Sequence, residues 1–362
     1  MRTRIAMPAT LPTTLTAALL VAIAGLAMPG CKEQPAAGTG QSSPATNSEV
    51  LTTFYPTAYF AGRIAGGLVT VRSPLPADED PIFWQPGADE MVQFQNARLV
   101  ITNGAEFEKW VARAPLPRAR TVASLSDEDL ETTGGPITME TTSHSHGPAG
   151  EHTHEGLDGH TWVSPDIAIV QARNIADAMK TAWPEHAEAF ETNLASLVED
   201  LEMLRVSLND LTPLVGEHRL LASHPAYNYL ARDLGWDVTN LDLDPESEDV
   251  QTVVDAVHDA LHHHEDHSHD HEHGEDHGHD HAHDEGEGEH DHDHEHSHGD
   301  KPVILLWEGE PTEAIRAALS DELGVTSVLF SPAEGQPDPT TDGDYMDVMR
   351  ANLDALREAL GG

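Results

Sequence analysis

Residues 184–211 read PEHAEAFETNLASLVEDLEMLRVSLNDL, and this stretch predicts a long helix. Its apolar residues recur at alternating spacings of four and three, which places them on one helix face; they are Phe190, Leu194, Leu197, Leu201, Leu204, Leu208 and Leu211. Pro184 suits the first turn of such a helix. The whole stretch would extend about 40 Å at the rise of an α-helix. Because the stripe lasts only about three heptads, we favour a rigid rod between two lobes over a coiled coil.

Short β-rich runs alternate with helical stretches on both sides of this helix, as expected where parallel sheets are covered by helices. The candidate strands are 50–55, 68–73, 98–103 and 121–125 before it, and 219–223, 237–243, 303–307 and 326–330 after it. The sequence therefore predicts an α/β fold with two lobes and a ligand site in the cleft between them. We expect an N-terminal lobe at 49–183, a linking helix at 184–212 and a C-terminal lobe at 213–362.

The first 48 residues have the composition of an export signal and a linker. Arg2 and Arg4 precede the apolar run 15–27, which has the length of a signal-peptide core and is too short to span a bilayer. The run is followed by Met-Pro-Gly and Cys31, which resembles a lipobox. We expect a signal peptide at 1–31, lipidation of Cys31 and a flexible tether at 32–48. An ordinary cleavage site near Cys31 is the alternative.

Charge and cysteine content exclude several classes of function. The chain has 63 acidic and 19 basic residues, a formal net charge of -44, so it repels nucleic-acid backbones and anionic membranes. Its one cysteine cannot build a disulfide framework or a thiolate zinc cluster. Any bound metal must therefore use histidines and carboxylates.

Two segments combine histidine with acid and have almost no apolar content, so we expect both to be loops outside the core. They are 141–159 and 262–300, and the second holds 16 His and 15 Asp or Glu in 39 residues. Imidazole suits zinc, copper and nickel, so the segments predict weak binding of several ions. The accessory ligands we expect are His144, His146, His152, His154, His267, His269, His271 and His273. A purely solubilising role of the charge is the alternative.

A selective metal site needs ligands on rigid elements, and two isolated histidines meet this condition. His160 lies in DGHTWVSPD, just before a helix expected from Pro165, and His224 follows an apolar strand in LLASHPAYNYL. Open α/β sheets place ligands at such carboxyl ends of strands. The two histidines fall in different lobes, so an ion between them would join the lobes. A structural or capping role is the alternative for each.

The chain resembles the solute-binding receptors of zinc and manganese ABC importers, the ZnuA-like and TroA-like proteins. The matching stretches are LTTFYP at 51–56, ARLVITNGAEFEKW at 97–110, DGHTWVSPDIAIVQARNIADAM at 158–179 and SHPAYNYLARDLGW at 223–236. The resemblance implies two α/β lobes bridged by a long helix, with one metal in the cleft. It also implies that His160 and His224 are the second and third ligands of that metal.

The family's first histidine is absent, because ADEDPIFWQP has Ile82 at that position. The late aspartate of some members is not evident either, since VLFSPAEG offers Ser331 and Pro332 there. Two histidines are too few for zinc. We expect a carboxylate to complete the site, and favour Glu79 or Asp80 beside Ile82. The further candidates are Glu308, Glu310, Asp242 and Asp244.

The resemblance implies a noncatalytic, monomeric receptor that captures zinc, with manganese as an alternative, and docks on a membrane permease. A periplasmic zinc buffer or metallochaperone is one alternative, and a zinc-dependent hydrolase is another. Against the hydrolase, the sequence contains no HExxH, GxSxG or Walker A motif. Adhesion at the cell surface is a third alternative, implied only by the family analogy.

Overall fold

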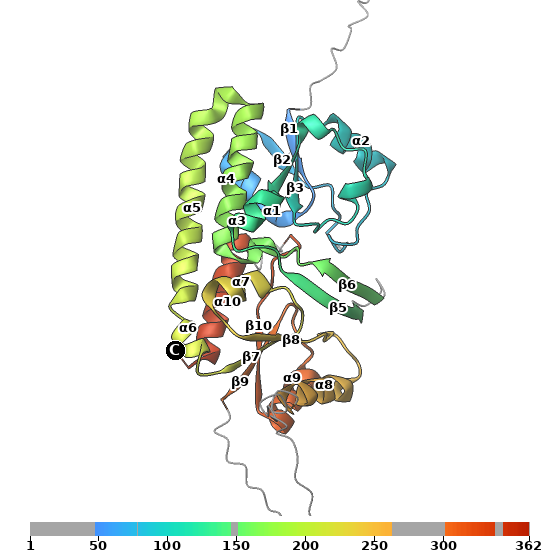
Figure 1. Ribbon diagram of the computed structural model, residues 1–362, viewed down its shortest axis with the longest axis vertical. Coiled ribbons are helices and arrows are strands. Elements are labelled where there is room, and N and C mark those ends of the chain that lie inside the picture. Colours follow the sequence, from blue (N-terminus) through green and yellow to red (C-terminus); the bar gives the residue numbers. More distant parts are fainter. Residues whose placement is uncertain (1–47, 78, 146–150, 263–300, 337–342, 362) are drawn as a thin grey trace, which may run out of the picture. The chain divides into compact units, whose positions relative to one another are not determined.

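The structure, a computed structural model, describes residues 48–77, 79–145, 151–262, 301–336 and 343–361. The described residues all belong to one compact unit. Two four-stranded parallel sheets, each covered by helices, make up this unit (Figure 1). This confirms the predicted α/β fold. Cys31 and the histidines at 146, 267, 269, 271 and 273 lie outside the described residues.

The first sheet has the strand order β2-β1-β3-β4. Its strands are β1 (Glu49–Thr52), β2 (Thr70–Arg72), β3 (Leu99–Gly104) and β4 (Thr121–Leu125). Successive side chains of a strand point to opposite faces. Val50 and Ile101 accordingly join the core beneath α1 (Tyr55–Ala65) and α4 (Pro165–Ala182), whereas Leu51 and Val100 join a cluster with Phe94 of α2 (Ala88–Asn96). Helices therefore cover both faces of this sheet.

The second sheet has the order β10-β9-β7-β8. Its strands are β7 (Arg219–Ala222), β8 (Val238–Asn240), β9 (Val303–Trp307) and β10 (Val325–Leu329). Leu221 and Leu305 face α8 (Val250–His262) and α9 (Glu313–Leu323), while Leu220 and Leu306 face the core shared with α7 (Asn228–Leu234) and α10 (Tyr345–Ala359). All eight predicted strands are thus present, with ends shifted by at most a few residues.

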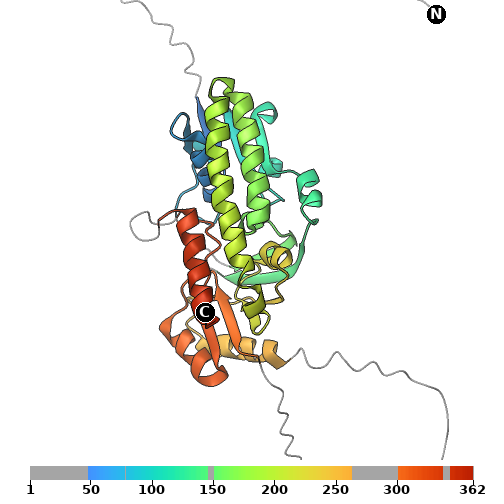
Figure 2. The ribbon, with the colours of Figure 1, turned by 90° about the vertical axis from the view of Figure 1, so that its left-hand side faces the viewer.

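Helix α5 (Ala187–Asn209) is the long helix predicted from the leucine stripe, and it packs beside α4 (Figure 2). All seven residues of the stripe are buried. The predicted start at Pro184 was wrong, because Pro184–His186 form a separate 3-10 turn. Proline has no N–H and fixes its own φ, so it opens this turn at the corner between the two helices. A short helix, α6 (Thr212–Val215), follows α5.

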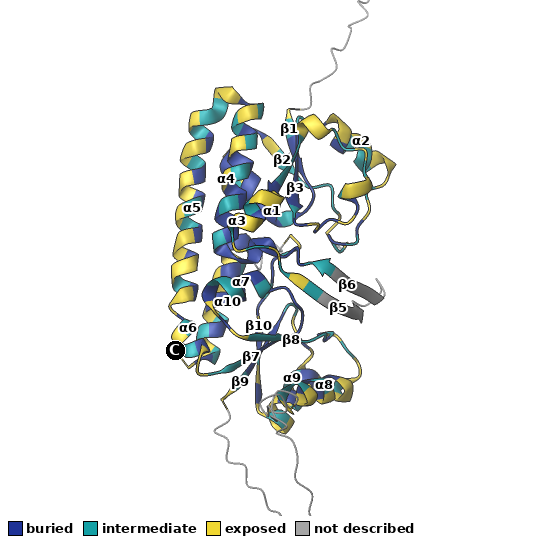
Figure 3. Cartoon of the chain, viewed as in Figure 1, coloured by how far each residue is buried: buried dark blue, intermediate teal, exposed yellow. Residues whose placement is uncertain are grey.

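The core continues from one sheet to the other rather than stopping between them (Figure 3). Tyr345, at the start of α10, is fully buried, and its ring lies 5.2 Å from that of Phe60 in α1. Its backbone N–H also donates to the Tyr55 hydroxyl at 2.9 Å. The last helix of the chain is therefore tied to the first. No helix in the described part of the chain is long and apolar enough to cross a membrane.

Residues 141–159 are not simply a loop, which corrects our expectation. They belong to an antiparallel hairpin of β5 (Thr138–Ser145) and β6 (Glu151–Leu157), which pairs His144 with His152 and Thr142 with His154. The low apolar content led to the wrong prediction, because a two-stranded ribbon satisfies its backbone by pairing and needs no core of its own. A short helix, α3 (Asp127–Thr132), precedes it.

We predict that Leu201→Ala destabilises the protein by about 2–5 kcal/mol, because it removes a fully buried side chain of α5 and leaves a cavity. Met203→Ala on the same helix is the control: its side chain is 54% exposed, and we expect a change within about 0.5 kcal/mol. Urea unfolding followed by circular dichroism measures both. Equal costs would contradict the packing of the stripe.

Candidate metal centre

His160 lies between β6 and a 3-10 turn, Thr161–Val163, that leads into α4. Its ring is 1% exposed. Asp158 Oδ1 accepts from the backbone N–H of His160 at 2.9 Å and lies 2.8 Å from its Nδ1. An ionised carboxylate accepts hydrogen bonds but has no hydrogen to donate, so Nδ1 of His160 carries the hydrogen in this contact. The arrangement leaves Nε2 as the atom available to another partner.

Asp158 is itself fixed from the second half of the chain. Its Oδ2 accepts from Asn228 Nδ2 at 2.9 Å, and its backbone oxygen accepts from the Tyr229 hydroxyl at 3.0 Å. Both donors belong to α7. The carboxylate is fully buried. Helix α7 therefore sets the orientation of the His160 ring through Asp158.

The Nε2 atom of His160 faces Glu334, a residue in the segment after β10. The distance from Nε2 to Glu334 Oε1 is 2.8 Å. Apart from this contact, the buried Nε2 has no hydrogen-bond partner within the described part of the chain. Ala333, the preceding residue, has a φ of 56°, a left-handed conformation that alanine adopts at a cost of about 1–2 kcal/mol. The chain accepts this strain where Glu334 meets His160.

His224 and Glu308 complete a group with these two residues. His224 follows β7 and Glu308 follows β9, so both stand at the carboxyl ends of neighbouring strands. The His160 and His224 ring centroids are 5.5 Å apart, and the rings are nearly perpendicular. His224 Nδ1 lies 3.9 Å from Glu308 Oε2. We call His160, His224, Glu308 and Glu334 the histidine–carboxylate cluster.

The electrostatics of the cluster show an excess of negative charge. Burial raises the pKa of Glu308 to about 8, helped by the charges of Glu334, Asp80 and Asp242 and opposed by His160. Burial lowers the pKa of His160, but its contacts with Asp158 and Glu334 outweigh that effect and raise the pKa to about 10. Both groups therefore keep their protons at neutral pH: burial disfavours the charged form of Glu308, and the neighbouring carboxylates favour the charged form of His160.

Of the two carboxylates predicted as ligands beside Ile82, Glu79 and Asp80, the structure brings only one near the cluster. Ile82 is 6% exposed and belongs to the hydrophobic core. Asp80 Oδ1 accepts from the Ile82 backbone N–H at 2.8 Å, and Asp80 is close enough to Glu308 to raise its pKa. Glu79 is exposed. Of the two predicted carboxylates, Asp80 is thus the one near the cluster.

Of the three other carboxylates predicted as possible ligands, one lies near the cluster and two have other roles. Glu310 is exposed and pairs with Arg316. Asp244 Oδ1 accepts from the Glu246 backbone N–H at 2.8 Å and so shapes a turn. Asp242 contributes to the raised pKa of Glu308, which places its charge near the cluster.

Sequence reasoning missed Asp158 and Glu334. Asp158 stands two residues before His160, and this Asp-x-His spacing was a usable signal, because a ligating histidine commonly donates its other N–H to a carboxylate. Glu334 was not predicted, because the position of the family's late aspartate falls on Ser331 and Pro332, three and two residues earlier. Neither of those carries a strong metal ligand. The signal for Glu334 was only a carboxylate soon after a C-terminal strand.

No group of three or more His, Cys, Asp or Glu side chains within the described ranges is already arranged as a metal site. His160 and Glu334 contact each other instead. The side chains of 140–155 are not described, so the predicted ligands His144, His152 and His154 are placed only by their backbone register.

Comparison with known proteins identifies the family. The profile of the family described as "Zinc-uptake complex component A periplasmic" matches residues 50–267, more than half of the chain. The chain belongs to this family. It is 24% identical over 317 residues to "Zinc-binding lipoprotein AdcA" of Streptococcus pneumoniae, and 28% identical over 198 residues to "Iron-binding protein YfeA" of Yersinia pestis.

The alignments cover a larger share of this chain than of AdcA, and about equal shares of this chain and of YfeA. The alignment with AdcA includes 85% of this chain and 55% of the relative, so the chain spans about half the length of that relative. The YfeA alignment includes 54% of this chain and 59% of the relative. Activities of the whole relatives are therefore not transferred to this chain by similarity alone.

Solved structures agree on the fold. The zinc-bound ZnuA-like domain of AdcA from Streptococcus pneumoniae superimposes with a TM-score of 0.62 at 22% identity, covering 87% of this chain and all of that domain. The metal-dependent lipoprotein YcdH of Bacillus subtilis gives a TM-score of 0.61 at 20% identity, with 86% and 98% covered. The predicted two-lobed architecture is thereby confirmed.

We predict that Asp158→Asn lowers the pKa of His160 from about 10, because the substitution removes a negative charge but keeps an acceptor for Nδ1. The raised pKa stabilises the metal-free fold at pH values below the unfolded pKa of about 6.5, and this contribution is lost as the pH rises towards 10. In Asp158→Asn, the stabilising contribution of protonated His160 should be lost at a lower pH than in the wild type.

Nitrogen NMR of the imidazole measures the titration of His160 in the metal-free protein. Asp166→Asn is the control, since Asp166 is exposed and pairs with Arg205. An unchanged pKa in Asp158→Asn would show that Asp158 does not govern the charge of His160.

Proposed function

We propose that this chain is the extracytoplasmic receptor of a metal ABC importer, which captures zinc and delivers it to a membrane permease. Manganese is the alternative cargo. Membership of the zinc-uptake family and the zinc-binding relatives support the proposal. The observation that carries it is the buried Nε2 of His160, which lies 2.8 Å from a carboxylate oxygen in a cluster with surplus negative charge. The protein acts as a noncatalytic monomer in this proposal.

We propose His160, His224, Glu308 and Glu334 as the ligands. Two nitrogen and two oxygen donors suit the four-coordinate geometry of zinc, while the oxygen share also admits manganese. Donor atoms on a tetrahedral zinc are roughly 3.3 Å apart at ordinary bond lengths. The 2.8 Å contact between His160 and Glu334 would thus widen by only about half an ångström. Asp80 is the candidate for a further oxygen ligand, in preference to Glu79.

The flanking segments extend the proposal. Export, cleavage before Cys31 and lipidation of that cysteine would tether the receptor to a membrane surface through residues 32–48. The histidines of 141–159 and 262–300 would collect metal near the cluster or the permease. We expect their binding to be weaker, because bringing several separate imidazoles around one ion costs side-chain conformational entropy.

We predict that His160→Ala, His224→Ala and Glu334→Ala each abolish the tightest zinc site. Each loss should exceed the roughly 10- to 100-fold typical of residues that only orient a ligand. Competition with a fluorescent zinc chelator, followed through the first equivalent of metal, measures the affinity. His218→Ala is the control, because its Nδ1 lies 2.8 Å from the Leu214 backbone oxygen, outside the cluster.

An unchanged first equivalent in all three variants would refute the ligand assignment. The importer role has its own test. Cells lacking the protein should take up radioactive zinc more slowly at low external concentration, whereas loss of a mere zinc buffer would leave the initial uptake rate unchanged.

We predict that Glu308→Gln stabilises the metal-free protein and weakens zinc binding. A carboxyl with a folded pKa of about 8 holds a proton that the unfolded chain has lost, so stability falls as the pH rises from about 4.5 to 8. The amide removes this cost, and we expect the melting temperature at pH 8.5 to rise by about 3 °C. The gain should vanish near pH 4.5.

Calorimetry and chelator competition measure the two effects of this change. Glu310→Gln is the control, because Glu310 is exposed and pairs with Arg316. A less stable Glu308→Gln variant with unaltered zinc affinity would assign Glu308 a structural role instead.

A further inference from the structure

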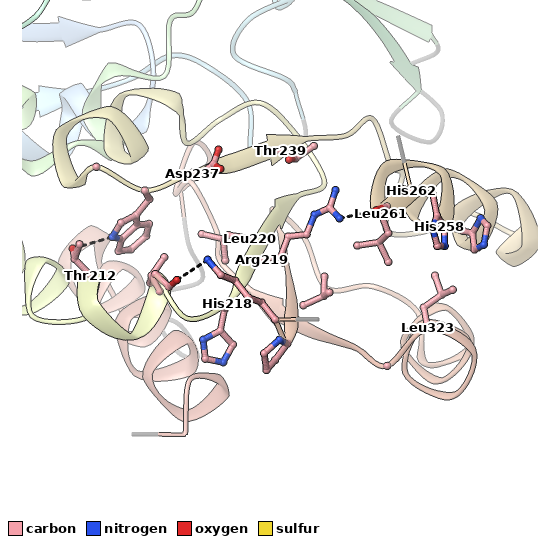
Figure 4. Close-up of a pocket in the computed structure, with 18 of the residues that line it drawn as sticks. Thr212, His218, Arg219, Leu220, Asp237, Thr239, His258, Leu261, His262 and Leu323 are labelled. Carbon is pink, nitrogen blue, oxygen red and sulfur yellow. Dashed lines mark hydrogen bonds between the residues drawn. The ribbon is translucent and has the colours of Figure 1, made fainter. Parts of the chain in front are cut away.

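A second pair of histidines lies at the end of α8, on the second sheet. His258 and His262 are four residues apart, a spacing that puts both on the same helix face. Their ring centroids are 4.4 Å apart, and both side chains are exposed (Figure 4). His262 belongs to the predicted loop 262–300, but in the structure it is the last residue of α8. Neither residue belongs to the histidine–carboxylate cluster.

The last turn of α8 is held in place from both sides. Val253, Val254 and Val257 bury the inner face of the helix against β9 and α9. At the C-terminus, Arg219 Nη1 donates to the Leu261 backbone oxygen at 2.7 Å (Figure 4). Arg219 Nη2 donates to the Ala260 backbone oxygen. A charged donor on the free carbonyls of a helix end opposes fraying. The two imidazoles are therefore carried on a rigid support.

The surroundings of the pair favour a cation. Asp259 Oδ1 lies 3.8 Å from His258 Nδ1, and Asp255 stands three residues before His258 on the exposed face of the helix. The C-terminal end of a helix also carries partial negative charge, although Arg219 offsets part of it. Both histidines line a cavity of about 1180 Å³, so water has access to their ring nitrogens.

We propose that His258 and His262 form a second site for a divalent transition metal. Two histidines at a spacing of four on a helix can bind one ion together, as they do in zinc enzymes with an HExxH helix. Zinc, copper and nickel match imidazole donors. With only two histidines and with water or Asp255 in the other positions, the site is weaker than the proposed cluster and exchanges its ion readily. The proposal of this second site does not depend on the proposed importer function.

Hydrogen exchange on the full-length protein tests this site, with zinc alone as the probe. An ion that bridges His258 and His262 must leave before the last turn of α8 opens. At free zinc about ten times the dissociation constant, opening of that turn should therefore be about tenfold less frequent. Mass spectrometry of peptides from residues 250–262 reads the exchange rate directly, without interference from ions bound elsewhere.

Matched variants separate this site from the other histidines. His258→Gln and His262→Gln should each abolish the protection, whereas His218→Gln, on another wall of the same cavity, should retain it. His160→Ala should also retain it, so failure of the proposed cluster would not affect this result. Circular dichroism checks that the exposed substitutions leave the fold intact.

Two results would overturn the proposal. One is an absence of zinc-dependent protection in the wild type throughout a titration that saturates the protein. The other is full protection in His258→Gln, which would place the bound ion elsewhere.

Discussion

Burial of Trp162 is the constraint on which the site and the joining of the two sheets depend. Its indole Nε1 donates to the Pro332 backbone oxygen at 2.7 Å, and its own backbone oxygen accepts from the Tyr345 hydroxyl at 2.8 Å. The ring is fully buried and packs edge-on against Phe54 and Phe107 of the first half. Since Trp162 is two residues from His160, and Pro332 two residues from Glu334, one side chain brings both to the same place.

In the proposed metal site, the stability of the fold is balanced against the capacity to accept an ion. Glu308 keeps a proton at neutral pH because of its burial and the neighbouring carboxylates, and His160 keeps one because of its contacts with Asp158 and Glu334. A metal bound at the proposed site would have to displace these protons, so the proposal implies an affinity that increases with pH. The left-handed backbone of Ala333, directly before the residue that contacts His160, shows that the fold accepts a local cost for this arrangement.

The features that could be predicted from the sequence are those in which buried apolar residues recur with the period of a helix or a strand. The strands and the stripe of α5 came from apolar patterns, and His160 and His224 stood out as polar residues at the ends of such elements. Features set by tertiary contact could not be found in this way. Glu334 reaches His160 only because a left-handed residue and the Trp162 hydrogen bond turn its segment inward. The hairpin 138–157 was missed because its stability does not rest on apolar residues.

Ile82 changes how the proposed ligand set is divided between the two halves. With a core isoleucine in place of the family's first histidine, His160 is the one proposed ligand that precedes α5. His224, Glu308 and Glu334 all follow strands of the second sheet. An ion would then be held mainly by the second half, with His160, fixed through Asp158 by α7, closing the coordination. Helix α7 also belongs to the half of the chain that follows α5. The four proposed ligands would therefore keep their positions relative to one another even if the first sheet moved.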